Sequence, residues 1–337
     1  MNFIATDPPL ENREKAFLAY LDTHHDPFEV AVLKSLLEKH PKQGALWLNA
    51  AAVARAMVQG VDYEVGDQRI AVSDRKGKTL YVYPIQVVKE GRIIAGSTYR
   101  DGVQQCLVAR EILAAKAAQK APHFYIEPES QLIRASYAIN MVDKYKKGRV
   151  IGVSGTPSLL GKKDETTNPE RYLCLEVPRE KALKRQDLPP ILVKDTAQQL
   201  DYLKRALAQD KLDKNENPLL LVTRDDVQTA EILAALAADP FFKSYTQTAL
   251  TAKTPPKEEK KALAAAGTQK QILIGAAGIV GRGTDIKAST PLFTACLFQP
   301  ATLAEEMQIR GRAGRFGETG YYRQILSQTD NPALRKP

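Results

Sequence analysis

An arginine-rich stretch, "QIRGRAGR" at residues 308–315, is the part of the sequence best suited to chemistry. It places three arginines and two glycines in eight positions, directly after a helix-like segment. Guanidinium groups match phosphate oxygens in bidentate geometry. An arginine supplied by a second domain can also stabilise the charge that develops during phosphoryl transfer. The stretch therefore predicts a site that handles a phosphate group.

The helix before this stretch has its own start signal. Thr302 and Glu305 form a T-x-x-E capping box, which predicts a helix over residues 302–312. On a helix that ran through the stretch, Gln308, Arg312 and Arg315 would share one face, because they lie at i, i+4 and i+7.

The two glycines of the stretch would fall on a different side of such a helix. Each costs roughly 1 kcal/mol relative to alanine in a helix interior. We therefore expect Gly311 and Gly314 to permit a close approach of another segment. The alternative, a solvated arginine-rich helix end, leaves the glycines unexplained.

A second motif, "ILIGAAGIVGRGTDI" at residues 272–286, joins an apolar strand to a glycine-rich loop. Glycines let backbone N–H groups approach a ligand closely. Asp285 could accept hydrogen bonds from ribose hydroxyls, and Arg282 could pair with a carboxylate or phosphate. A plain strand-to-helix turn is the alternative. Because the loop lies one βα unit before residues 308–315, we expect the two motifs to occupy neighbouring strand ends.

The fold class follows from alternating strand and helix patterns after about residue 172, which predict an α/β fold with a parallel sheet flanked by helices. In such sheets ligands bind beyond the carboxyl ends of the strands, and we expect both motifs in loops of that kind. The expected strands are 190–193, 219–222, 246–250, 271–274, 293–298 and 321–326. The expected helices are 196–209, 226–238, 256–266 and 302–312.

The earlier part of the chain predicts a mixed α+β portion. Residues 11–58 have helical patterns with short breaks, and residues 61–88 predict two or three antiparallel strands. Further helices are expected over 101–120 and 130–147, followed by a short buried strand at "RVIGV".

Composition narrows the classes of function. The 337 residues carry 48 Lys and Arg against 39 Asp and Glu, a net charge of +9 that suits a nucleotide, nucleic acid or acidic partner but also simple solubility. The three cysteines and four histidines form no metal-ligand or disulfide pattern. No apolar run approaches a membrane span and no signal-peptide core is present, so we expect a soluble protein.

Together the motifs resemble a known family. "GRGTDI" followed by "QIRGRAGR" and "GETG" resembles motifs V and VI of superfamily-two helicase-type motors, and is most similar to the SecA preprotein-translocase ATPase family. Weaker similarities lie upstream of these motifs and occur in the same order as in that family: "VDYEV", "YRDGVQQCLVARE", "GVSGTP", "RQDLPPILV", "LLLVTRDDVQTAEIL" and "ALTAK". The resemblance covers roughly residues 45–328. It implies a second RecA-like motor domain over 166–337, preceded over 45–165 by the end of the first motor domain and the base of a substrate clamp. Residues 1–44, before the resemblance begins, are expected to be a helical lead-in of unknown role.

The resemblance also implies roles by position. Arg312 and Arg315 would be arginine fingers that reach the γ-phosphate, and Gln308 would help to orient them. Gly283 and Asp285 would contact the nucleotide. The expected interdomain coupling residues are Arg282, Gly155 and Thr156.

A P-loop is missing from the sequence. "GKT" at residues 77–79 lacks the first glycine of G-x-x-x-x-G-K-[ST] and is expected in a hairpin turn, while "GTPSLLGKK" has one residue too many and "DET" at 164–166 follows a polar loop. ATP with Mg is therefore expected only if a P-loop-bearing motor half completes the site, and the chain is not expected to hydrolyse ATP alone. It is either part of a longer protein or a protein that has lost ATPase capacity.

The leading expectation is the rear part of an ATP-driven translocase that acts on a polypeptide, in the cytoplasm or at a membrane surface. One alternative is a non-catalytic binding protein or secreted effector on the same scaffold. The other is a nucleic-acid helicase fragment, which the modest charge and the lack of interleaved aromatic and basic residues disfavour.

Overall fold

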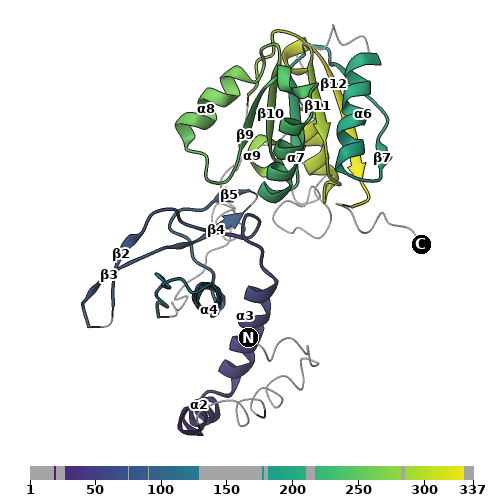
Figure 1. Ribbon diagram of the computed structural model, residues 1–337. Coiled ribbons are helices and arrows are strands. Elements are labelled where there is room, and N and C mark those ends of the chain that lie inside the picture. The colour runs from purple at the N-terminus through teal and green to yellow at the C-terminus, as the bar shows by residue number, and fades with distance from the viewer. Residues whose placement is uncertain are drawn as a thin grey trace, which may run out of the picture. The chain divides into compact units, whose positions relative to one another are not determined.

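A computed structural model describes residues 19, 27–74, 76–89, 91–128, 177, 181–209, 217–281 and 285–329 (Figure 1). The chain divides into two compact units. The first contains the described residues up to 128 except 91 and 92, and the second contains those two residues and the described residues from 177 onward.

The first unit combines helices with short antiparallel strands. Its helices are α2 (Pro27–Lys39), α3 (Pro41–Ala56) and α4 (Val103–Ala117). Strands β1 (Tyr63–Val65), β4 (Ile85–Lys89) and β5 (Arg92–Ile93) form one sheet in the order β1–β4–β5. Strands β2 (Ile70–Ser73) and β3 (Thr79–Val82) form a separate hairpin. The "GKT" segment lies at its turn, with φ +78° at Gly77, so it is no P-loop.

A small core holds the first unit together. Ala54, Tyr63, Ile85 and Leu107 are buried against one another. The guanidinium of Arg110 donates to the carbonyl of Met57 at 2.9 Å and to the hydroxyl of Tyr63, so it satisfies the end of α3 while bracing β1. The mixed α+β portion expected here is confirmed.

The second unit is built on a seven-stranded parallel sheet. Its order is β6–β12–β11–β8–β10–β9, and β7 pairs with a later part of β12. The strands are β6 (Lys184–Asp187), β7 (Ile191–Val193), β8 (Leu219–Thr223), β9 (Thr246–Leu250), β10 (Gln271–Ala276), β11 (Leu292–Cys296) and β12 (Thr319–Ser327). The predicted parallel sheet is confirmed, and β6 is an additional strand that the sequence did not indicate.

Helices cover both faces of this sheet (Figure 1). Alternate residues of β8 reach opposite cores: Leu219 and Leu221 pack with α6 (Thr196–Gln209) and α7 (Asp226–Ala238), whereas Leu220 and Val222 face the other side. On that side lie α8 (Pro256–Ala265), α9 (Ala277–Val280) and α10 (Leu303–Arg310). The arrangement is RecA-like, with β8 buried in the middle.

Some expectations fall elsewhere. The helix over 130–147, the strand at "RVIGV" and the boundary between 165 and 166 lie outside the described residues. The expected boundary after residue 44 falls inside α3. No helix in the described part of the chain is long and apolar enough to cross a membrane.

Candidate functional site

The helix that carries the arginine-rich stretch starts as predicted but ends sooner. The hydroxyl of Thr302 accepts from the backbone N–H of Glu305 at 3.1 Å, while the carboxylate of Glu305 accepts from the N–H of Ala301. Helix α10 ends at Arg310, and Gly311 is its C-cap. The predicted single face shared by Gln308, Arg312 and Arg315 is therefore wrong, because the chain leaves the helix before the last two.

A left-handed residue directs the chain after the helix. Gly314 has φ +67°, a conformation that favours glycine, and the turn η7 (Arg315–Gly317) follows. A Cβ on Gly314 would lie 2.8 Å from the Cβ of Arg185 and 2.9 Å from its backbone nitrogen. The expected close approach is thus confirmed at Gly314. At Gly311 a Cβ would meet only carbonyls of its own helix, at 3.2 and 3.3 Å.

Arg312 is directed into the protein. Only 6% of it is exposed, and its Nη2 and Nε donate to the carbonyl of Gly281 at 2.6 and 3.2 Å. Burial, with the nearby charge of Arg315, lowers the pKa of Arg312 to about 10, and Asp285 opposes the shift. The side chain therefore remains a cation at neutral pH, and its two hydrogen bonds hold Gly281 in place.

Arg315 lies nearer the surface and contacts the other end of the same loop. Its Nη1 donates to Oδ1 of Asp285 at 3.1 Å, with side chains 34% and 49% exposed. Its Nε donates to the carbonyl of Gly311 at 3.1 Å. The two arginines therefore hold residues 281 and 285, on either side of 282–284.

The remaining predicted site residues fall into two groups. Gln308 is half-buried in α10. Arg282, Gly283, Gly155 and Thr156 lie outside the described residues.

The meeting point of the motifs lies elsewhere on the sheet than predicted. Strand β10 neighbours β8 and β9, so its end does not adjoin those of β11 and β12. Residues 311–315, called the arginine turn below, follow α10, which runs back from β11. This turn packs at the amino ends of β6 and β12, beside Arg185 and Gly320. The loop reaches this edge because residues 285–291 lead to the start of β11; the N–H of Ser289 donates to the carbonyl of Gly267, before β10. The expectation of a site beyond carboxyl strand ends is wrong for residues 308–315.

A charged cluster that the sequence reading missed adjoins the turn. Asp187 at the end of β6 accepts from Nε of Arg185 at 2.7 Å and from Nη2 of Arg310 at 2.6 Å. Burial raises the pKa of Asp187, but the hydrogen bonds from both arginines outweigh it, and the net pKa lies below the ordinary value. The signal that could have revealed the cluster is R-x-D in residues 185–187, since i and i+2 share one face of a strand.

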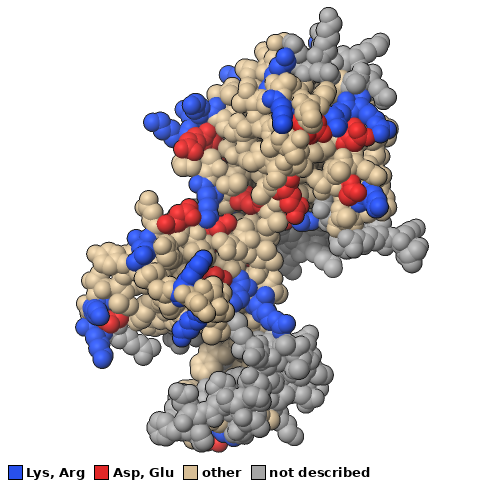
Figure 2. Space-filling model, in the orientation of Figure 1, with Lys and Arg blue, Asp and Glu red and all other residues tan. Residues whose placement is uncertain are grey.

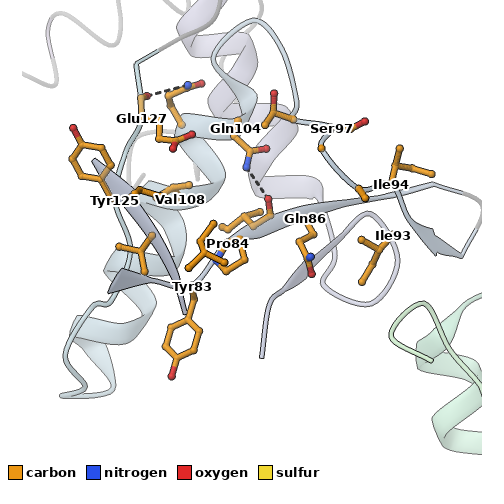
Figure 3. Close-up of a pocket in the computed structure, with 18 residues that line it drawn as sticks. Tyr83, Pro84, Gln86, Ile93, Ile94, Ser97, Gln104, Val108, Tyr125 and Glu127 are labelled. Atoms are coloured by element: carbon orange, nitrogen blue, oxygen red, sulfur yellow. Dashed lines mark hydrogen bonds between the residues drawn. The ribbon is translucent and has the colours of Figure 1, made fainter. Parts of the chain in front are cut away.

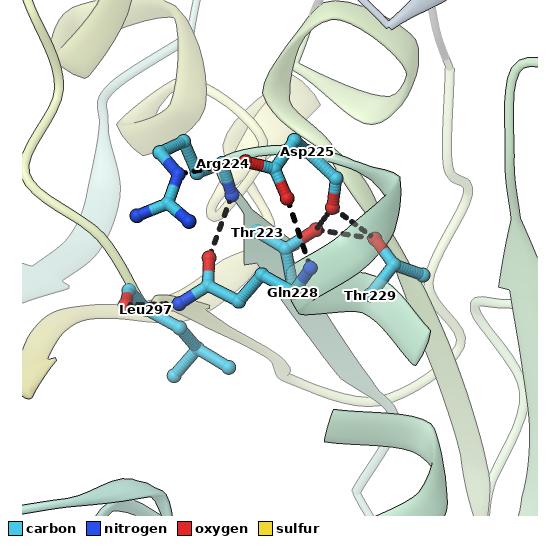
Figure 4. Close-up of polar contacts among 6 residues, drawn as sticks. All are labelled: Thr223, Arg224, Asp225, Gln228, Thr229 and Leu297. Atoms are coloured by element: carbon cyan, nitrogen blue, oxygen red, sulfur yellow. Dashed lines mark hydrogen bonds and ion pairs between the residues drawn. The ribbon is translucent and has the colours of Figure 1, made fainter. Parts of the chain in front are cut away.

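A network of polar contacts lies at the carboxyl ends of β8 and β11, where ligands usually bind to such a sheet (Figure 4). Gln228 is buried, donates from Nε2 to the carbonyl of Leu297 at 3.1 Å and accepts from the N–H of Arg224 at 2.8 Å. The hydroxyls of Thr223 and Thr229 lie 2.6 Å apart beneath it. These contacts fasten α7 to the sheet.

Replacing Asp225 by alanine tests this fastening. Oδ1 of Asp225 accepts from the N–H of Gln228 at 2.9 Å and caps α7. Loss of the cap should destabilise the second unit by about 1–2 kcal/mol, measured from hydrogen exchange of the β8 amides. As a control, Asp201→Ala removes an exposed carboxylate on α6 and should cost less than about 0.5 kcal/mol. Equal effects of the two variants would contradict the capping role.

The first unit contains a pocket of about 350 Å³ between the β2–β3 hairpin, β4 and the start of α4 (Figure 3). Apolar side chains such as Pro84 and Val108 line it together with Tyr83 and Tyr125. Gln104 donates from Nε2 to the carbonyl of Ile85 at 3.0 Å, which fixes one wall. Such a mixed lining suits an extended peptide better than a highly charged ligand.

Surface charge is mixed. On the face in Figure 2, lysines and arginines are interspersed with aspartates and glutamates. That face offers no continuous basic groove for a nucleic-acid backbone. The described residues also contain no cluster of three or more His, Cys, Asp or Glu side chains that could hold a metal ion.

Comparison with known proteins gives SecA relatives over most of the chain. It is 25% identical over 305 residues to the protein translocase subunit SecA of Mycoplasmopsis synoviae, which covers 88% of this chain and 24% of that protein. The SecA of Ureaplasma parvum is 28% identical over 286 residues, which are 82% of this chain and 31% of that protein. The SecA of Oleidesulfovibrio alaskensis is 25% identical over 335 residues, which are 97% of this chain and 33% of that protein. The chain spans about a quarter to a third of the length of these relatives, and no family model matches it.

Comparison with solved structures gives DEAD-box proteins that match less than half of this chain. The yeast DEAD-box splicing factor Prp28 matches 48% of this chain and 33% of its own, with 18% identity and a TM-score of 0.38. Helicase domain 2 of Mss116p, solved with an RNA duplex, matches 45% of this chain and 58% of its own, with 15% identity and a TM-score of 0.36. The sequence is thus SecA-like over most of the chain, and the strand order of the second unit is RecA-like.

Proposed function

We propose that this chain supplies the second motor domain, and part of the substrate-contacting region, of a SecA-like ATP-driven protein translocase. The observation that carries the proposal is the contact between the two motifs: Arg315 pairs with Asp285, and Arg312 holds Gly281. The similarity to SecA over most of the chain supports the same function.

The proposed nucleotide site is shared with a P-loop-bearing motor half, in the same longer chain or in another subunit. That half would hold ATP and Mg, because the P-loop and its acidic partner supply those contacts. On ATP binding, Arg315 would exchange the carboxylate of Asp285 for phosphate oxygens, which compete for the same guanidinium. Asp285 would then be available to the nucleotide sugar, together with Gly283.

The remaining roles concern orientation and coupling. Gln308 would orient the arginines from α10, and Arg282 would bridge to the P-loop half. Gly155 and Thr156 would transmit closure of the nucleotide cleft. Because such motors act by shifting between open and closed populations, the chain alone should bind nucleotide weakly and not hydrolyse it.

The proposed substrate is a polypeptide, contacted by the first unit at the pocket beside the β2–β3 hairpin. Its apolar walls and tyrosines can accept side chains of many kinds without reading a sequence. The proposal includes a location in the cytoplasm or at a membrane surface.

A second candidate is a binding protein that keeps the motor scaffold without catalysis. The burial of Arg312 favours it, since that guanidinium already donates twice to the carbonyl of Gly281. In this case the two arginines only hold Gly281 and Asp285 in place.

The deciding experiment measures ATP hydrolysis by the longest natural form of the protein, alone and with an unfolded polypeptide or single-stranded RNA. We expect hydrolysis that the polypeptide stimulates and RNA does not. Stimulation by RNA alone would contradict the translocase function in favour of a helicase. Absence of hydrolysis in every mixture would favour the non-catalytic scaffold.

A further inference from the structure

Asp187 joins two arginines that belong to different elements. Its Oδ1 accepts from Nε of Arg185 at 2.7 Å and its Oδ2 accepts from Nη2 of the same arginine at 3.1 Å. Oδ2 also accepts from Nη2 of Arg310 at 2.6 Å. One carboxylate therefore ties β6 to the last residue of α10.

Arg185 extends this tie to both ends of the arginine turn. Its Nη1 donates to the carbonyl of Arg310 at 3.1 Å, where the helix ends. Its backbone lies against Gly314, so closely that a Cβ there would come within 3.0 Å of its Cα. The path of residues 311–314 is thus set by a strand that lies far away in the sequence.

Asp187 supplies the negative charge that lies between Arg185 and Arg310. Arg310 also lies 3.5 Å from Glu306, but Arg185 has its two side-chain ion-pair hydrogen bonds with Asp187. Without that carboxylate, two guanidinium groups would face each other beside Arg312 and Arg315. Like charges at this range repel, and the repulsion would push Arg185 and the end of α10 apart.

We propose that Asp187 is a positioning residue: by holding Arg185 and Arg310, it fixes the turn from which Arg312 contacts Gly281 and Arg315 contacts Asp285. The positioning concerns the folded chain itself. Only its consequence for ATP hydrolysis rests on the proposed function.

The first test is hydrogen exchange of the 337-residue chain with Asp187→Asn. Amides of residues 311–317 should exchange about tenfold faster, while those of β8 stay unchanged. Asp201→Asn is the matched control, since Asp201 accepts from Arg205 at 2.5 Å on the exposed face of α6, away from the turn. It should leave residues 311–317 unchanged. Unaltered exchange there in Asp187→Asn, or equal acceleration across β8, would overturn the proposal.

Two further variants separate positioning from general damage. Arg310→Gln removes the second arginine of the tie and should accelerate the same amides. Asp187→Glu keeps the charge and should restore most of the protection. No restoration by glutamate together with loss of β8 protection would mean that Asp187 only maintains the fold, which would overturn the proposal.

The second test is catalytic and uses the longest natural form. Asp187→Asn should lower kcat for ATP about tenfold with KM changed less than about twofold, because the arginines would act on the transition state rather than on substrate binding. An unchanged kcat would overturn the positioning of catalytic arginines. If the wild type hydrolyses no ATP, the proposed function fails while the exchange result still decides the positioning.

Discussion

Arg315→Ala is expected to lower ATP hydrolysis by the longest natural form about 10³-fold while the protein stays folded. An arginine that meets the transferring phosphoryl group is worth roughly 10³–10⁵ in rate. Its pair with Asp285 is exposed on both sides, and such pairs contribute about 0–1 kcal/mol to stability. The measurements are kcat by phosphate release and protection of the β8 amides by hydrogen exchange.

Arg312→Ala should differ from Arg315→Ala in one respect. It should lower the rate to a similar extent but also destabilise the second unit, because the buried carbonyl of Gly281 loses its donors at a cost of about 1–3 kcal/mol. Arg205→Ala, which removes an exposed arginine of α6, is the control for both variants. If Arg315→Ala keeps more than about half of the activity, its role as a finger is wrong, and both arginines act only as anchors of the loop.

The parallel sheet could be predicted from sequence because its signals are local. The apolar run "LLLV" predicted β8, the helical pattern after it predicted α7, and T-x-x-E predicted the start of α10. Strand β6 could not be found in this way. Its sequence, "KRQD", has no apolar pattern, and its strand conformation comes from pairing with β12, more than a hundred residues later.

The end of α10 shows a different limit. Placing Gln308, Arg312 and Arg315 on one helical face assumed that glycine only weakens a helix, whereas glycine after the last turn also ends one. Both readings fit "RGRAGR", and the structure ends the helix because β6 occupies the space beside Gly314. The pairing of residues 281 and 285 with the turn likewise depends on the path back to β11.

Because of this packing we expect Gly314→Ala to destabilise the second unit strongly. The left-handed conformation costs a residue with a Cβ about 1–2 kcal/mol, and overpacking adds about 1–3 kcal/mol. Here the crowding atoms belong to the backbone and Cβ of Arg185, so the clash cannot be relieved without moving β6. We expect a loss of about 3 kcal/mol or more, read from exchange of the β8 amides.

Two neighbouring glycines separate the causes of that loss. Gly317 also has a positive φ, +81°, but a Cβ there meets only the flexible side chain of Lys181, so Gly317→Ala should cost about 1–2 kcal/mol. Gly311 has φ −64° and lies at the end of α10, so Gly311→Ala should change stability by less than about 1 kcal/mol. Similar losses for Gly314→Ala and Gly317→Ala would show that strain alone determines the cost. A loss for Gly314→Ala well above those of the other two variants would show that contact with Arg185 sets the path of the turn. The same contact would then set the directions of Arg312 and Arg315.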